Sequence, residues 1–151
     1  MSAVAKRLQS ELMSLMMAGD DDASAFPSED NLFEWSATIR GSKGTVYEDL
    51  CYELSMSFND EYPYKAPKIM FRTPCFHPNV DEHGNICLDI LKEKWSAAYS
   101  VLSILQSLRS LLSDPNPDSP LNQVAANLWQ DQTQYKKELL TRNAAAVVSS
   151  R

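Results

Sequence analysis

The sequence lacks the features that mark membrane and secreted proteins. No apolar run approaches the roughly 20 residues that a helix needs to cross a bilayer. The N-terminus has no basic segment followed by an apolar one, which a secretion signal would require. We therefore expect a soluble, intracellular protein with no membrane partner.

Positive charge is also scarce. The chain has 14 Lys and Arg against 20 Asp and Glu, for a formal net charge of −6. No region gathers enough basic residues to follow a phosphate backbone. We expect no nucleic acid as a partner.

Cysteine is present in an odd and small number, as Cys51, Cys75 and Cys87. An odd set in a chain without a secretion signal argues against a disulfide framework, so at least one thiol is free. A cytosolic cysteine is most often a small buried hydrophobic residue. A chemical role for any of the three therefore needs further evidence.

The length sets the number of domains. With 151 residues, 44% of them apolar, the chain can bury one good core but is short for two. No internal repeat or low-complexity linker divides it. We expect a single domain over residues 1–151, and a monomer.

Hydrophobic periodicity predicts a first helix over residues 4–17. Lys6, Ser10, Met13 and Met17 fall on its outer side. Its inner stripe is predicted to consist of Val4, Leu8, Leu12, Leu15 and Met16.

The period then changes to two, which is typical of half-buried strands. Residues 33–40 and 51–58 alternate in this way, and a Gly-Ser-Lys-Gly turn between them predicts an antiparallel pair. Residues 68–71 form a third short strand, entered through residues 62–67, whose prolines exclude a helix. The pattern indicates a meander of three or four strands.

No period persists over residues 73–99, a stretch far longer than an ordinary loop, and long ordered loops often carry function. Helices are predicted after it, over residues 101–112, 121–129 and 133–148. Pro115 and Pro117 end the first of them. The inner side of the last is predicted to hold Tyr135, Leu139, Ala146 and Val147. Because strands and helices are segregated along the chain, the fold class is α+β.

The long loop contains a specific motif. It reads Phe-His-Pro-Asn-Val over residues 76–80, and Gly84, Cys87 and Trp95 follow. Together with Tyr-Pro-x-x-x-Pro at residues 62–67 and Asp-Pro-Asn-Pro at residues 114–117, it resembles the active-site signature of the ubiquitin-conjugating enzymes. The similarity extends over residues 6–148.

The resemblance implies an N-terminal helix, a four-stranded antiparallel meander, a long active-site loop, a central helix and two C-terminal helices. It also implies a thioester of ubiquitin on Cys87, formed without a cofactor or a metal. A thioester carrier needs an accessible thiol that attacks a carbonyl and later leaves. No histidine or basic residue lies within a few positions of Cys87, which suits transfer between activated acyl groups better than cleavage of amides.

Further roles follow from the resemblance. Asn79 corresponds to the residue that stabilises the oxyanion or orders the loop, and His77 and Pro78 to structural residues of the same loop. Ser119 occupies the position beside the thioester where many members have Asp. Asp89 is a second candidate for attracting the incoming amine.

Partner surfaces are also implied. The resemblance assigns contacts with the ubiquitin-activating enzyme to Lys6 and Arg7, although a plain solvated helix face is the alternative. It assigns contacts with RING-type ligases to Tyr64, Ala97 and Ala98. A second, non-covalent ubiquitin would bind on the outer face of the sheet at Ser24.

Four segments resemble the cell-cycle branch of the family, which works with the anaphase-promoting complex. By that likeness, the substrates would be mitotic regulators such as cyclins, and the location cytoplasmic and nuclear. Residues 1–5 form a shorter leader than the extension this branch usually carries. The segments are residues 24–27, 44–50, 73–76 and 91–97.

Two alternatives remain at this stage. Cys75, His77, His83 and Cys87 offer four zinc ligands, but they contain no C-x-x-C pair and Pro78 stiffens the loop between them. The other alternative is a non-catalytic relative that only binds ubiquitin or a ligase. Such relatives lack the cysteine that is present here.

Overall fold

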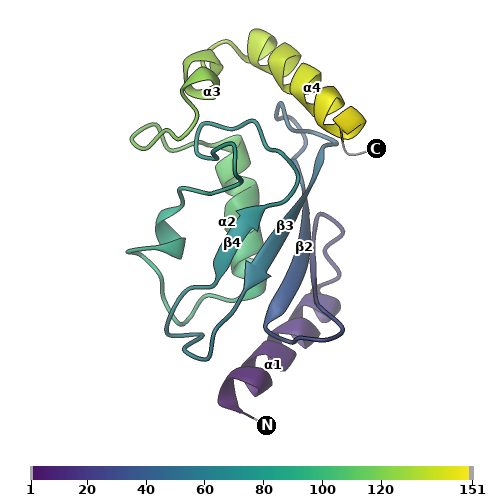
Figure 1. The fold of residues 1–151 in the computed structure, drawn as a ribbon, viewed down its shortest axis with the longest axis vertical. Coiled ribbons are helices and arrows are strands. Elements are labelled where there is room, and N and C mark those ends of the chain that lie inside the picture. The colour runs from purple at the N-terminus through teal and green to yellow at the C-terminus, as the bar shows by residue number, and fades with distance from the viewer. Residues whose placement is uncertain (1, 150–151) are drawn as a thin grey trace.

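The computed structural model describes residues 2–149, and the side chains of residues 2–143. Within these residues, one helix precedes a four-stranded sheet and three α-helices follow it. Figure 1 shows α1 and α4 at opposite ends of the molecule. The predicted α+β class is confirmed. The elements are α1 (Ala3–Ala18), β1 (Ala23–Pro27), β2 (Glu34–Arg40), β3 (Cys51–Ser57), β4 (Lys68–Phe71), the short 3₁₀ helix η1 (Asp89–Leu91), α2 (Val101–Ser113), α3 (Gln123–Leu128) and α4 (Gln132–Ser149).

The sheet is an antiparallel meander in the order β1-β2-β3-β4. The two-residue alternation places one set of side chains against the core and the other on the outer face, as in β2, where Trp35, Ala37 and Ile39 are buried. Ser24 lies on the outer face of β1, opposite Thr38 of β2.

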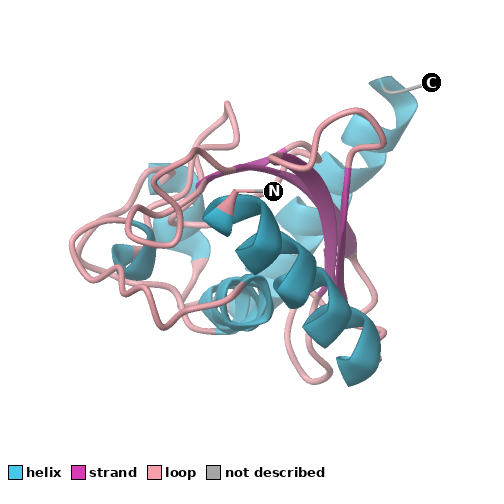
Figure 2. Ribbon diagram, turned by 90° about the horizontal axis from the view of Figure 1, so that it is seen from below, coloured by secondary structure: helices cyan, strands magenta, loops and turns pink. Residues whose placement is uncertain are grey.

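The sheet curves around α1 and α2, as Figure 2 shows from below. Helix α2 packs against β1 and β2, and α1 packs against α2 and β1. Six apolar residues of α2 are buried in this layer, which explains the strong helical stripe in its sequence. They are Val101, Ile104, Leu105, Leu108, Leu111 and Leu112.

Helix α1 begins at the Ser2 cap and ends where Gly19 adopts a left-handed backbone with φ of 58°. Leu8 and Leu15 are buried as predicted, but the prediction for Met16 is wrong, because its side chain is 66% exposed. Met16 follows Leu15 by about 100° around the helix, which turns it off the buried stripe.

The C-terminal helices close the far end of the molecule. Tyr135 and Leu139 of α4 are buried, as their spacing predicts. The predictions for Ala146 and Val147 lie outside the described side chains. No helix within residues 2–149 is both long and apolar enough to span a bilayer.

Candidate active site

Cys87 lies on the long segment between β4 and α2, in a small hairpin. Its backbone N–H donates to the carbonyl of Asn79 at 2.9 Å, and Asp81 N–H donates to the carbonyl of Asn85 at 3.0 Å. Val80 pairs with Ile86 between these two bonds. The thiol is therefore held at a fixed place in the loop, half-exposed and free.

Gly84 allows this hairpin to approach the sheet. Its φ is 90°, and a Cβ built on it would lie 2.1 Å from the carbonyl oxygen of Phe71. The carbonyl of Gly84 accepts a 2.9 Å hydrogen bond from Phe71 N–H at the end of β4. Only glycine permits both the backbone conformation and the close contact.

Asn79 is fully buried, and its carboxamide is turned toward residues 116–119. Its Nδ2 donates to the carbonyls of Asn116 at 2.9 Å and Ser119 at 3.0 Å, and its Oδ1 accepts from Asn116 N–H at 2.8 Å. Both amide hydrogens are thus engaged by that loop. This geometry favours the loop-ordering role over a donor that stands free for an oxyanion.

His77 and Pro78 connect the segment around Asn79 to α2 and to residues 121–122. The Nδ1 of His77 accepts from Asn79 N–H at 3.0 Å, so the proton sits on Nε2, which lies 2.7 Å from the carbonyl of Leu111 in α2. The carbonyl of Pro78 accepts from the N–H groups of Leu121 and Asn122. Burial lowers the pKa of His77 to about 4, so the ring is neutral and structural at neutral pH.

Two tyrosine hydroxyls meet the loop at Phe76. Tyr47 OH and Tyr135 OH lie 2.5 Å and 2.9 Å from the Phe76 carbonyl, and 2.5 Å from each other. Burial raises the pKa of both hydroxyls, which keeps them neutral. This junction joins α4 and residues 41–50 to the segment that carries Cys87.

Ser119 and Asp89 flank the hairpin differently. Ser119 is exposed, and its carbonyl is the group that Asn79 binds. Asp89 begins η1 with its side chain 43% exposed, and Lys94 Nζ lies 3.6 Å from its Oδ2. An incoming ammonium would meet a carboxylate that already has a cation beside it.

The predicted partner residues fall into distinct settings. Lys6 is exposed, whereas Arg7 is half-buried and engaged within the chain: its Nη2 donates to the carbonyls of Ala97 at 3.2 Å and Tyr99 at 2.9 Å. The alternative prediction, that Lys6 and Arg7 form a simple solvent-exposed helix face, is therefore wrong for Arg7. Tyr64 is 81% exposed, and Ala98 is also exposed.

Sequence reasoning missed Glu11 as a structural centre. Its side chain is only 6% exposed and accepts bonds from Arg7, Tyr62 and Val101. The i,i+4 spacing from Arg7 signals a helix pair. Nothing local in the sequence signals the two long-range bonds.

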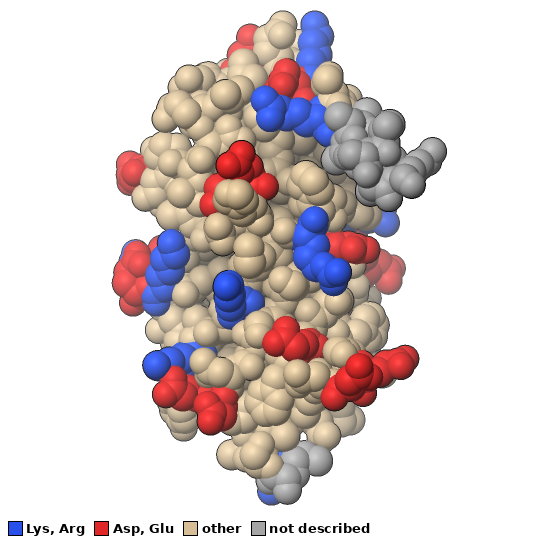
Figure 3. Space-filling view, viewed as in Figure 1, with Lys and Arg blue, Asp and Glu red and all other residues tan. Residues whose placement is uncertain are grey.

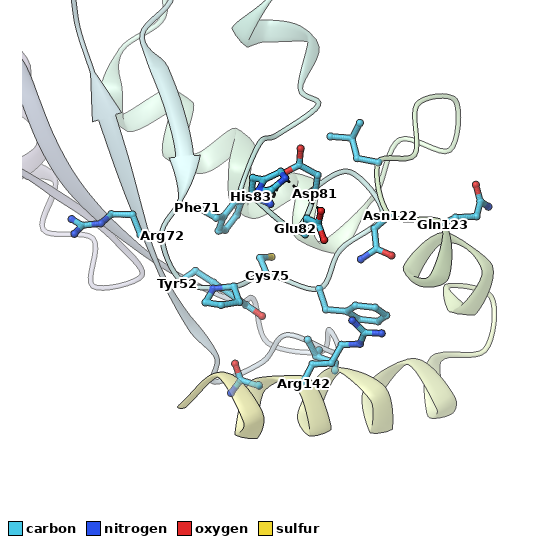
Figure 4. A pocket seen from close by; sticks show the side chains of 16 residues that line it. Tyr52, Phe71, Arg72, Cys75, Asp81, Glu82, His83, Asn122, Gln123 and Arg142 are labelled. Atoms are coloured by element: carbon cyan, nitrogen blue, oxygen red, sulfur yellow. Dashed lines mark hydrogen bonds and ion pairs between the residues drawn. The ribbon is translucent and has the colours of Figure 1, made fainter. Parts of the chain in front are cut away.

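A cavity of about 630 Å³ lies beside the loop, between its 81–84 turn, residues 121–123 and α4. Figure 4 shows that the cysteine facing it is Cys75, near Tyr52, and Cys87 is not part of its lining. Burial raises the pKa of the Cys75 thiol well above its ordinary value. Cys75 is therefore poorly suited to act as a nucleophile.

The ligands of the zinc alternative are not brought together. His77 uses both ring nitrogens within the protein, and His83 is exposed. Among the residues that the structure describes, no cluster of three or more His, Cys, Asp or Glu side chains has the arrangement of a metal site.

Basic and acidic side chains are interspersed over the face drawn in Figure 3.

Comparison with known proteins bears on this site. The sequence model of the family described as "Ubiquitin-conjugating enzyme" matches residues 7–143. The curated protein "Ubiquitin-conjugating enzyme E2-20 kDa" of Schizosaccharomyces pombe is 56% identical over 142 residues, which cover 93% of this chain and 81% of the relative. Both matches include the whole hairpin and the loop that Asn79 binds.

Proposed function

The chain belongs to the ubiquitin-conjugating enzymes, and within that activity we propose that Cys87 carries the C-terminus of ubiquitin as a thioester and passes it to lysine amines. Enzymes of this family work with ubiquitin, an activating enzyme and ligases. The observation that carries the assignment is a free, half-exposed cysteine in a small hairpin, where its backbone N–H is bonded to the carbonyl of Asn79. Of the other two cysteines, Cys75 is buried and Cys51 lies exposed on the outer face of the sheet, in β3.

The reaction has two acyl transfers. The thiolate of Cys87 attacks the thioester between the activating enzyme and ubiquitin, and the activating enzyme's thiol leaves. A lysine amine then attacks the new thioester, an isopeptide bond forms, and Cys87 leaves as thiolate and regains a proton. No cofactor takes part in either step.

We assign the neighbouring residues to the second step. Asn79 orders the 116–119 loop, which places Ser119 beside the reacting carbonyl, while His77 and Pro78 hold the loop from below. Asp89 helps to attract the amine, in competition with Lys94, whose Nζ lies 3.6 Å from its Oδ2. The hydrogen bonds of Asn79 to the carbonyls of Asn116 and Ser119 support this division.

A charging assay tests the central claim. Incubation with ubiquitin, activating enzyme and ATP is expected to add one ubiquitin through a bond that reducing agent cleaves. Cys87→Ser should convert it to a reductant-resistant ester, while Cys51→Ser, at the other accessible thiol, should keep the reducible adduct. A wild-type chain that forms no adduct would remove the proposal.

Partner surfaces follow the same reasoning. Lys6 and Arg7 on α1 serve the activating enzyme, and Tyr64, Ala97 and Ala98 serve RING-type ligases. Ser24, on the outer face of β1, marks the place for a second ubiquitin. The exposure of Lys6, Tyr64 and Ala98 supports this assignment.

The ligase is the anaphase-promoting complex, and the substrates are mitotic regulators such as cyclins. The resemblance to the cell-cycle branch supports this choice; it is carried by residues 24–27, 44–50, 73–76 and 91–97. We also propose that the chain forms a single catalytic domain and acts in the cytoplasm and the nucleus. Discharge of the charged protein in the presence of that complex, compared with unrelated RING ligases, tests it. Equal stimulation by all ligases would contradict the preference.

A further inference from the structure

Glu11 is a buried carboxylate that the chemistry at Cys87 does not use. It projects from α1 and is 6% exposed. Its Oε1 accepts from Val101 N–H at 2.6 Å, and its Oε2 accepts from Tyr62 OH at 2.5 Å and from Arg7 Nε at 2.9 Å. A buried charge is tolerated only when it is bonded in this complete way.

The donors to Glu11 come from separate parts of the chain. Val101 begins α2, and Tyr62 stands two residues before Tyr64 in the first proposed ligase-contacting segment. Arg7 extends the network to the second such segment, because its Nη2 donates to the carbonyls of Ala97 and Tyr99. One carboxylate thus connects both segments to the first helix.

The first segment also contacts Trp95, two residues before the second segment. Trp95 Nε1 donates to the carbonyl of Pro63 at 2.9 Å, and the Trp95 ring lies 6.2 Å from that of Tyr62. The guanidinium of Arg7 lies 5.7 Å from the centre of the Tyr62 ring. Arg7, Glu11, Tyr62 and Trp95 therefore form one connected network, and a change at Glu11 is expected to affect both segments.

We infer that Glu11 is a positioning residue for ligase-stimulated transfer: it fixes the relative placement of residues 62–64 and 97–99 before a ligase binds. The inference rests on the proposed ligase contacts of Tyr64, Ala97 and Ala98. A preordered surface binds its partner without first losing conformational freedom, which gives Glu11 its effect on affinity.

Glu11→Gln isolates this role because it keeps the size of the side chain. Its carbonyl still accepts from Val101, but its amide group meets the guanidinium of Arg7, a donor facing a donor. Arg7 loses its counter-charge, and its hold on the 97–99 carbonyls weakens. Ligase must then order the surface as it binds.

The experiment follows discharge of ubiquitin from preloaded protein to free lysine, without ligase and with a titrated RING-type ligase that stimulates the wild type. For Glu11→Gln we expect unchanged ligase-free discharge, an unchanged maximal rate and a half-saturating ligase concentration raised about tenfold. Glu138→Gln is the matched control, because Glu138 also pairs with an arginine four residues away on its own helix, α4, but its side chain is 39% exposed. It should behave as wild type.

Tyr62→Phe is a second, milder variant that removes one donor and is expected to raise the half-saturating concentration by a smaller factor. Wild-type ligase dependence in both variants would overturn the inference. So would an equal fall in ligase-free and ligase-stimulated rates, which would mean a general loss of structure. If the wild-type protein accepts ubiquitin but no RING ligase stimulates its discharge, the proposed ligase contacts are wrong as well. If the wild-type protein does not accept ubiquitin at all, the proposed function itself is wrong.

Discussion

The carboxamide of Asn79 makes three hydrogen bonds to residues 116–119, so its removal acts on that loop and on the reacting centre together. We expect Asn79→Ala to accept ubiquitin from the activating enzyme at nearly the normal rate. Discharge to lysine should slow about a hundredfold, since amine attack is the step that depends on this preorganised loop. Single-turnover charging and discharge measure the two steps.

Asn85→Ala provides the control for that experiment. Asn85 lies in the same hairpin, but within the described residues its exposed amide binds only Asp81 Oδ2, at 2.9 Å. Both steps should remain normal. An equal loss of charging and discharge in Asn79→Ala would instead indicate collapse of the loop.

His77 makes stability depend on pH. Burial lowers its folded-state pKa to about 4, whereas an unfolded histidine titrates near 6.5, so between these values the unfolded chain binds a proton that the folded one rejects. The stabilisation from neutral His77 is complete above pH 6.5 and is lost as the pH falls to 4. The full effect is about 3 kcal/mol.

Urea unfolding at several pH values between 4 and 7 checks this expectation. His77→Gln should flatten the dependence relative to the wild type. Parallel curves for wild type and His77→Gln would contradict the assignment.

At the residue scale, the sequence predicted which residues form the site but not the hydrogen bonds around them. The motif picked out Cys87 and Asn79 through resemblance. The partners of the Asn79 amide lie 37 and 40 positions further along the chain, and no local pattern reports such a contact. Glu11 escaped notice for the same reason, since a glutamate on a helix is ordinarily exposed.

Among the elements, Gly84 is the turn on which the active-site hairpin depends. We expect Gly84→Ala to lower the free energy of unfolding by about 3 kcal/mol or more, because the new Cβ would collide with the backbone of Phe71. The hairpin must shift to relieve the collision, so discharge from Cys87 should also slow. Urea unfolding and single-turnover discharge measure both effects.

Gly44 offers a matched comparison in a different turn. Its φ is 81°, but a Cβ there would meet nothing within 4 Å. Gly44→Ala should therefore cost about 1 kcal/mol from backbone strain alone and leave discharge unchanged. Similar losses in the two variants would argue against the close approach at Gly84.

Regular elements were the most predictable part of the fold. Two-residue alternation located β2 and β3 nearly to the residue, the short strand predicted after the prolines of residues 62–67 coincides with β4, and the apolar stripe located α2. The first strand was not located by pattern, because β1 has five residues and ends in Pro27, and only its pairing with β2 defines it. Short edge strands carry little periodic signal.

At the scale of the whole molecule, the hydroxyls of Tyr47 and Tyr135 meet at the Phe76 carbonyl and connect residues 41–50 and α4 to the segment that carries Cys87. Tyr47→Phe and Tyr135→Phe should each lower the free energy of unfolding by about 1 kcal/mol. Because the hydroxyls share one acceptor and contact each other, the double variant should lose less than the sum, with a coupling of at least about 0.5 kcal/mol. A double-mutant cycle in urea measures it.

Tyr52→Phe is the control for that cycle. The Tyr52 hydroxyl is buried and bonds no nitrogen or oxygen of the described residues; only the Cys75 thiol, a weak hydrogen-bonding group, lies beside it. Its removal should leave stability unchanged or raise it, since an unpaired buried hydroxyl opposes folding. Strictly additive losses in the cycle would show that the two tyrosines act separately.

The differing burial of the three cysteines makes the native protein a selective target for alkylating reagents. Cys75 is buried, while Cys51 and Cys87 are accessible from solvent. With Cys51 replaced by serine, one maleimide-reactive thiol would remain on the folded chain. The rate of fluorophore attachment would then report, in real time, what fraction of the enzyme is unloaded.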